Sequence, residues 1–166
     1  MTTDGAAQEP ATTPAARSAG GNRHVVARAT EIEPGGRKLV TVRGREIVIF
    51  NVNGEFYGLI NRCPHQGAPL MAGAIVSRLV APEPGDYRLT RPGEMIRCPW
   101  HCWEFDIRTG QSLCDPNSVQ ARAFNVAVQP GKALVDGPFV AESVDVSVED
   151  EYVVVTLEGP AGALDA

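Results

Sequence analysis

Short β-branched segments separated by turn residues dominate the chain from residue 23 onward, and they restrict its possible folds most strongly. The expected strands cover residues 24–29, 38–42, 45–52, 55–61, 94–99, 103–107, 124–128, 133–135, 143–148 and 152–157. Asn53-Gly54 lies between two of them and is a strong hairpin signal, because both residues tolerate positive φ. No window of 11 or more residues shows a convincing helical period. The pattern therefore predicts an all-β domain of many short antiparallel strands.

Several stretches fall outside this pattern. Residues 1–22 contain no Val, Ile, Leu, Phe, Tyr or Trp. They cannot bury enough apolar surface to offset the entropy of ordering, so we expect a disordered tail. Residues 159–166 are expected to be a second loose tail, which leaves one domain over 23–158. Within it, the Pro- and Gly-rich stretch 76–93 predicts a long inserted surface loop or excursion, and a further insertion is expected around 119–140.

Charge and hydropathy exclude several classes of function. Lys plus Arg number 15 and Asp plus Glu number 20, which gives a net charge of −5. Nucleic-acid binding needs a basic surface, so we expect no nucleic-acid partner. No apolar run approaches about 18 residues, so no membrane contact is expected. The first 20 residues lack the apolar core of an export signal. This predicts a cytoplasmic location, where the four cysteines would not form a disulfide framework.

Two of the three histidines lie close to a cysteine. Cys63 and His65 form a C-x-H pair, and Cys98 and His101 form a C-x-x-H pair, with 32 residues (66–97) between the pairs. Both pairs fall on expected turns, where side chains can converge. Thiolate and imidazole are ligands of zinc and of iron–sulfur centres. Zinc fingers usually group Cys with Cys and His with His, whereas each loop here supplies one of each, which suits a dinuclear centre. A tetrahedral zinc site stays open as the alternative.

The loops CPHQGAPLMAG (63–73) and CPWHCWEFDIRTGQ (98–111) resemble the two cluster-binding loops of the Rieske family, and the resemblance extends over about residues 24–157. It implies an antiparallel β-sandwich with a small cluster-binding subdomain made of two loops, at about 62–73 and 97–111. It also implies one Rieske-type 2Fe-2S cluster per chain, with two Cys on one iron and two His on the other. The implied ligands are Cys63, Cys98, His65 and His101.

Departures from the family pattern indicate the branch that the chain resembles. Respiratory-chain Rieske proteins tie their loops with a disulfide, but the matching positions here are Ala68 and Trp100. They also place Ser and Tyr hydroxyls near cluster sulfur, where this chain has Trp103 and Phe105. These differences favour ferredoxins and oxygenase components over quinol oxidisers. Cys102 stands where oxygenase-type loops usually carry Gly, so a positive φ at this position would be strained.

The resemblance implies a Rieske-type ferredoxin, a one-electron carrier between a flavin-dependent reductase and a terminal oxygenase. The chain is not expected to catalyse a reaction alone. A Rieske oxygenase subunit also needs a mononuclear iron held by two His and a carboxylate, and only His24 remains for it. The alternatives are a small electron-transfer subunit of a nitrite-reductase or arsenite-oxidase type, and a zinc-binding structural module.

The remaining candidate residues receive simpler interpretations. Cys102 and Cys114 are expected to be small buried residues. A redox-active thiol, a disulfide between the two, or ligand exchange at the cluster are the alternatives. His24 borders the tail and is expected to be solvated. Three acidic residues near the second loop are candidates for docking a basic partner: Glu104, Asp106 and Asp115.

Overall fold

The computed structural model of the chain describes residues 22–141, 144, 146–147 and 149–157. The expected tails therefore lie outside the described residues, apart from Asn22. The described elements are β1 (Arg23–Arg28), η1 (Ala29–Glu31), β2 (Arg37–Val42), β3 (Arg45–Val52), β4 (Glu55–Ile60), η2 (Leu70–Ala72), β5 (Ala74–Glu83), β6 (Asp86–Arg97), β7 (Glu104–Asp106), β8 (Ala123–Pro130), α1 (Gly131–Val135), β9 (Phe139–Ala141) and β10 (Glu151–Thr156). No helix in this part of the chain is long and apolar enough to cross a membrane.

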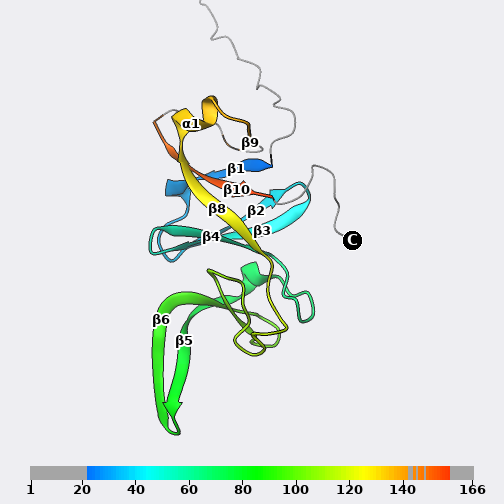
Figure 1. The fold of residues 1–166 in the computed structure, drawn as a ribbon, viewed down its shortest axis with the longest axis vertical. Helices are drawn as coiled ribbons and strands as arrows, with labels where there is room; N and C mark the ends of the chain where they lie inside the picture. The colour runs from blue at the N-terminus through cyan, green and yellow to red at the C-terminus, as the bar shows by residue number, and fades with distance from the viewer. Residues whose placement is uncertain (1–21, 142–143, 145, 148, 158–166) are drawn as a thin grey trace, which may run out of the picture.

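The strands form two sheets, which confirms the expected all-β fold. A 7-stranded sheet has the order β2-β3-β4-β8-β10-β1-β9, and a 3-stranded sheet has the order β5-β6-β7. All pairs are antiparallel except β1 with β9. The larger sheet folds over itself, so that Val40 and Ile47 pack in one core with Val153 and Val155. Figure 1 shows the smaller sheet and the long loops at one end of this β-sandwich.

β3 joins the sandwich to the loops, because successive side chains of a strand point to opposite faces. Ile47 and Ile49 are fully buried in the core of the sandwich. Val48, Phe50 and Val52 point the other way and belong to a second core beneath the loops. The near-continuous apolar run of β3 therefore reflects burial on both faces, and it fixes the loops on the sheet.

Residues 76–93 form an excursion from the larger sheet, but the loop alternative is wrong. This stretch lies in a long hairpin of β5 and β6, which Figure 1 shows projecting away from the larger sheet. The prolines do not break it because they occupy special positions. Pro82 and Pro84 lie near the tip beside the Gly85 turn, and Pro92 lies where the register of the ladder shifts. Proline is tolerated at strand ends and bulges, where no ladder donor is needed.

Two expected strands near the C-terminus are also wrong. Residues 133–135 belong to α1, in which Leu134 is buried. An apolar run of three residues is too short for periodicity to separate helix from strand. Of the expected strand 143–148, only Val144, Val146 and Ser147 are described, and none of them is in a strand. Instead, β9 pairs in parallel with β1.

Candidate metal centre

The first Cys–His pair lies on a loop closed by its own backbone. The N–H of Cys63 donates to the carbonyl of Ala68 at 2.8 Å, and the N–H of Gly67 donates to the carbonyl of Cys63 at 2.8 Å. Gly67 has φ 84, a left-handed conformation that glycine adopts without a steric penalty. The loop thus turns tightly after Cys63, and His65 lies in this turn with an exposed side chain.

The second loop has the same hydrogen-bond pattern. The N–H of Cys98 donates to the carbonyl of Trp103 at 2.7 Å, and the N–H of Cys102 donates to the carbonyl of Cys98 at 3.2 Å. Cys102 occupies the position that Gly67 holds in the first loop, and it has φ 58. A left-handed conformation costs a residue with a Cβ about 1–2 kcal/mol. The strain expected if Cys102 had a positive φ is therefore present.

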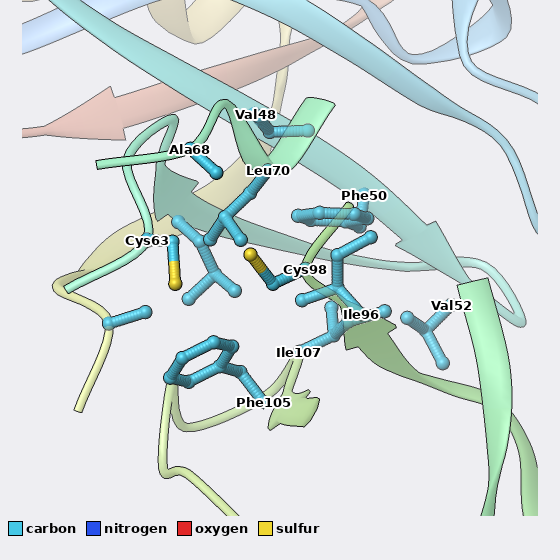
Figure 2. Close-up of a cluster of buried hydrophobic side chains, with 12 residues drawn as sticks. Val48, Phe50, Val52, Cys63, Ala68, Leu70, Ile96, Cys98, Phe105 and Ile107 are labelled. Atoms are coloured by element: carbon cyan, nitrogen blue, oxygen red, sulfur yellow. The ribbon is translucent and has the colours of Figure 1, made fainter. Parts of the chain in front are cut away.

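The structure brings all four candidate ligands together at two depths. Cys63 is 1% exposed and Cys98 is 2% exposed, and Figure 2 shows them side by side among apolar side chains. His65 and His101 are both exposed. Their ring centroids lie 4.8 Å apart with the planes at 78°. Each loop therefore contributes one buried thiol and one exposed imidazole.

The surroundings of Cys63 act on its sulfur in opposite directions. Burial raises the pKa of the Cys63 thiol most strongly, and the neighbouring Cys98 thiol raises it further. The backbone N–H groups of His65 and Gln66 donate toward the sulfur and work to lower that pKa. The net pKa is raised, so the free thiol is protonated at neutral pH and a metal must displace the proton. The two amide donors then stabilise the negative charge of a metal-bound thiolate.

Two indoles border the exposed imidazoles. Trp103 stacks on His65 with ring centroids 4.7 Å apart and planes at 9°. Trp100 lies edge-on to His101 at 6.4 Å and is 58% exposed. Stacking restricts the ring orientation of His65, while Trp100 adds a large apolar surface beside the imidazoles.

The donor set fits a dinuclear centre. The four donors form a buried thiol pair and an exposed imidazole pair, each made from both loops. A cluster whose two irons take different ligand pairs matches this separation by depth.

Three expectations about other cysteines and histidines are wrong. Cys102 and Cys114 are exposed rather than buried, and both are free thiols rather than a disulfide. His24 is fully buried rather than solvated. β1 is an inner strand of the larger sheet, between β10 and β9, so neighbours on both sides cover His24. Proximity to the tail in sequence therefore did not indicate exposure.

The three acidic candidates for docking a basic partner each have a local hydrogen-bond or ion-pair partner. Arg97 pairs with Glu104 at 2.7 Å. Asp106 is 9% exposed and pairs with Arg91. Asp115 accepts a hydrogen bond from the backbone N–H of Ser118 at 3.2 Å. Ion pairs therefore neutralise Glu104 and Asp106 locally, whereas Asp115 caps a turn with one of its oxygens.

An ionic network that the sequence did not reveal fixes the root of the hairpin. Arg91 pairs with Glu94 at 2.6 Å and with Asp106 at 2.7 Å. Arg108 pairs with Glu94 at 3.3 Å and with Glu55 of β4 at 2.7 Å. The network thus joins β4, β6, β7 and the turn after β7, through pairs that are 14, 15 and 53 positions apart in sequence. Pairs at such separations are not visible in a local sequence pattern.

Replacing Arg91 with Gln is expected to destabilise the protein by about 1–3 kcal/mol at pH 7, because two partly buried carboxylates lose a charged hydrogen-bond donor. Burial works to raise the pKa of Glu94, but the hydrogen bonds and charges of Arg91 and Arg108 outweigh it and hold that pKa below 4.5. A lowered pKa contributes stability that is complete above about pH 4.5 and is lost as pH falls through the lowered value.

Thermal unfolding at pH 7 and at about pH 3.5 measures this effect. The difference between the wild-type protein and Arg91→Gln is expected to shrink at the lower pH. Arg88→Gln is the matched control, because Arg88 pairs with Asp86 on an exposed surface and is itself 67% exposed. We expect it to change stability by less than about 0.5 kcal/mol. Equal losses in the two variants would contradict a special role for the network.

Similarity to known proteins agrees with this geometry. Residues 22–128 match the family model of the Rieske [2Fe-2S] domain. The ferredoxin component of a naphthalene 1,2-dioxygenase system from Pseudomonas aeruginosa is 29% identical over 106 residues, which cover 64% of this chain and 86% of that protein.

Two solved structures share the fold. The carbazole 1,9a-dioxygenase ferredoxin from Nocardioides aromaticivorans IC177 has a TM-score of 0.51 and 23% identity, covering 81% of this chain and 96% of that one. A complex of reduced oxygenase and oxidised ferredoxin from carbazole 1,9a-dioxygenase matches with a TM-score of 0.51 and 22% identity, covering 81% of this chain and 92% of that one.

Proposed function

Because the chain belongs to the Rieske [2Fe-2S] domain family and so carries a Rieske-type 2Fe-2S cluster, we propose that its two Cys–His pairs are the cluster ligands. Cys63 and Cys98 ligate one iron. His65 and His101 ligate the other. The observation that carries this assignment is the convergence of a buried thiol pair and an exposed imidazole pair on two loops with the same backbone geometry.

The residues around the pairs suit electron transfer without a substrate pocket. The cluster, when bound, accepts and releases one electron at a time. The apolar core beneath the loops keeps water from the thiols, and the backbone N–H groups near Cys63 offset its negative charge as a thiolate. The exposed imidazoles of His65 and His101 lie at the surface, where a redox partner can approach them.

The chain is an electron carrier of the Rieske ferredoxin type. We propose that it takes electrons from a flavin-dependent reductase and delivers them to a terminal oxygenase. Two findings support these partners: the dioxygenase-system relative, which the chain matches over most of its length, and the ferredoxin of similar fold seen in complex with its oxygenase. The cytoplasmic location and the domain bounds 23–158 stay predictions.

Electron paramagnetic resonance of the dithionite-reduced protein, with metal analysis of the same sample, tests the ligand assignment. We expect two irons per chain and a rhombic signal whose average g lies below that of all-Cys 2Fe-2S ferredoxins. One zinc per chain without a signal would favour the zinc-binding module raised from the sequence. A signal of the all-Cys type would contradict ligation by His65 and His101.

A further inference from the structure

We propose that the outer half of the β5–β6 hairpin, residues 78–90, is a docking arm, and we call these residues the distal arm. It contacts the redox partner, the terminal oxygenase, when that protein is bound at the exposed imidazoles. The proposal rests on the proposed function, because it assigns the partner of the same centre. It adds a second contact surface, away from the imidazoles, that determines which partner protein binds.

The distal arm extends from the same end of the molecule as the imidazoles (Figure 1). β5 begins at Ala74, directly after the first ligand loop, and β6 ends at Arg97, directly before Cys98. The hairpin is therefore inserted between the two loops that hold the candidate ligands. Figure 1 shows it extending from the end of the molecule where these loops lie, away from the larger sheet.

One face of the distal arm is apolar and exposed. Leu79 and Leu89 are directly paired across the strands, so their side chains share a face. Tyr87 lies two residues from Leu89 on β6 and points to the same face. The exposed fractions are 56% for Leu79, 70% for Tyr87 and 72% for Leu89. Three such side chains together are on the scale of a few hundred Å², typical of surface patches that mark interaction sites.

A bulge and a set of ion pairs fix the direction of the distal arm where it leaves the rest of the hairpin. Between Val76 and Arg78 the register advances two residues on β5, while on β6 it advances five, from Met95 to Thr90. This bulge contains Arg91 with φ 49 and Gly93 with φ 74. Arg91 and Glu94, within the same bulge, belong to the ionic network that reaches Asp106 and Arg108. Bulges redirect a strand, and here the ion pairs fix the new direction.

The size of the patch favours a redox partner over a second copy of the chain. A stable interface buries about 1,200–2,000 Å² in total, which two such patches cannot supply. Transient electron-transfer complexes bury less than about 1,200 Å², and the patch together with the imidazole surface can reach that range. The distal arm therefore fits as one part of a composite surface.

Charge contributes little to the chemistry expected of the partner. Arg78 of the distal arm and Arg62 beside the first loop are exposed, and neither forms an ion pair within the part of the chain described. Arg88 pairs with Asp86 of its own strand. Glu83 near the tip is also exposed, so the two arginines and two carboxylates of the distal arm balance. The apolar face therefore determines the match, and the partner is a redox protein with an apolar depression.

The test compares the holoprotein with the triple variant Leu79→Thr, Tyr87→Thr, Leu89→Thr, in which β-branched residues preserve strand propensity. The electron acceptor is the terminal oxygenase that the wild-type protein reduces fastest within a panel including the naphthalene 1,2-dioxygenase and 3-phenylpropionate dioxygenase oxygenases. Ferricyanide serves as a small acceptor that needs no docking. Val135→Ser is the matched control, because Val135 is 64% exposed on α1, at the opposite end of the molecule in Figure 1.

We expect the second-order rate of oxygenase reduction to fall at least tenfold in the triple variant, with an unchanged EPR signal and ferricyanide rate. The single variant Tyr87→Thr keeps the Leu79–Leu89 pair and is expected to lose about threefold. An unchanged oxygenase rate, or an equal loss toward ferricyanide, would overturn the docking role. A wild-type dimer that the triple variant dissociates would assign the patch to a second copy. If the wild-type protein reduces ferricyanide but no oxygenase, the partner assignment in the proposed function fails, and the docking arm fails with it.

Discussion

Replacing His101 with Ala is expected to abolish the Rieske EPR signal, and replacing His65 with Cys is expected to convert it toward the signal of an all-Cys cluster. The reason is that two neutral imidazoles on one iron give the Rieske centre its characteristic signal and its raised potential. A thiolate in place of His65 adds negative charge at that iron. The potential should then fall by on the order of a hundred millivolts or more, toward the roughly −400 mV of plant-type ferredoxins. EPR and protein-film voltammetry measure the two effects.

Cys102→Gly is the control for these variants. Cys102 lies next to His101 and is a free, exposed thiol with φ 58. Glycine accepts this conformation without strain, so the variant removes the thiol and preserves the loop. We expect its signal and potential to match the wild-type protein, with a stability gain of about 1 kcal/mol. An unaltered signal in His101→Ala would contradict ligation by His101. A lost signal in Cys102→Gly would mean that the Cys102 thiol is needed at the cluster.

The family and its cluster could be predicted from the sequence because the chemistry of such a centre depends on residue type and local spacing. Cys63 with His65, and Cys98 with His101, are each only a few residues apart, so each pair must lie on one loop. The strands before the first loop were also predictable. Their alternating or continuous apolar runs, interrupted by Asn53-Gly54, leave few other ways to bury the side chains.

The features that the sequence did not predict depend on contacts between distant residues. Arg108 meets Glu55 across 53 positions, and Arg91 meets Asp106 across 15. The long hairpin was not predicted because proline argues against a strand. The bulge and the tip that accommodate the prolines are visible only in the structure. His24 is buried because β9 and β10 enclose its strand, and the tail beside it gave no sign of that.

Among the described glycines, Gly110 tolerates a side chain least, because it combines a left-handed backbone conformation with close packing. Its φ is 76, and its N–H donates to the carbonyl of Asp106 at 2.7 Å. Its own carbonyl accepts from the N–H of Ala121 at 2.8 Å. A Cβ at this position would lie 2.0 Å from the carbonyl oxygen of Ala121, a backbone atom that cannot rotate away. The second ligand loop is thus locked against the segment that leads into β8.

Gly110→Ala is therefore expected to destabilise the protein by about 3–5 kcal/mol, the sum of a left-handed backbone and an unrelieved clash. The matched control is Gly85→Ala at the tip of the hairpin, which has a similar φ of +89 but nothing within 4 Å of the added Cβ. It carries only the backbone cost, about 1 kcal/mol. At roughly 2–4 °C per kcal/mol, the apparent melting temperature should fall by about 10 °C in the first variant and about 3 °C in the second. Equal shifts would mean that the backbone at Ala121 moves to accept the new methyl group. The close approach of the two segments would then not hold the second loop in place.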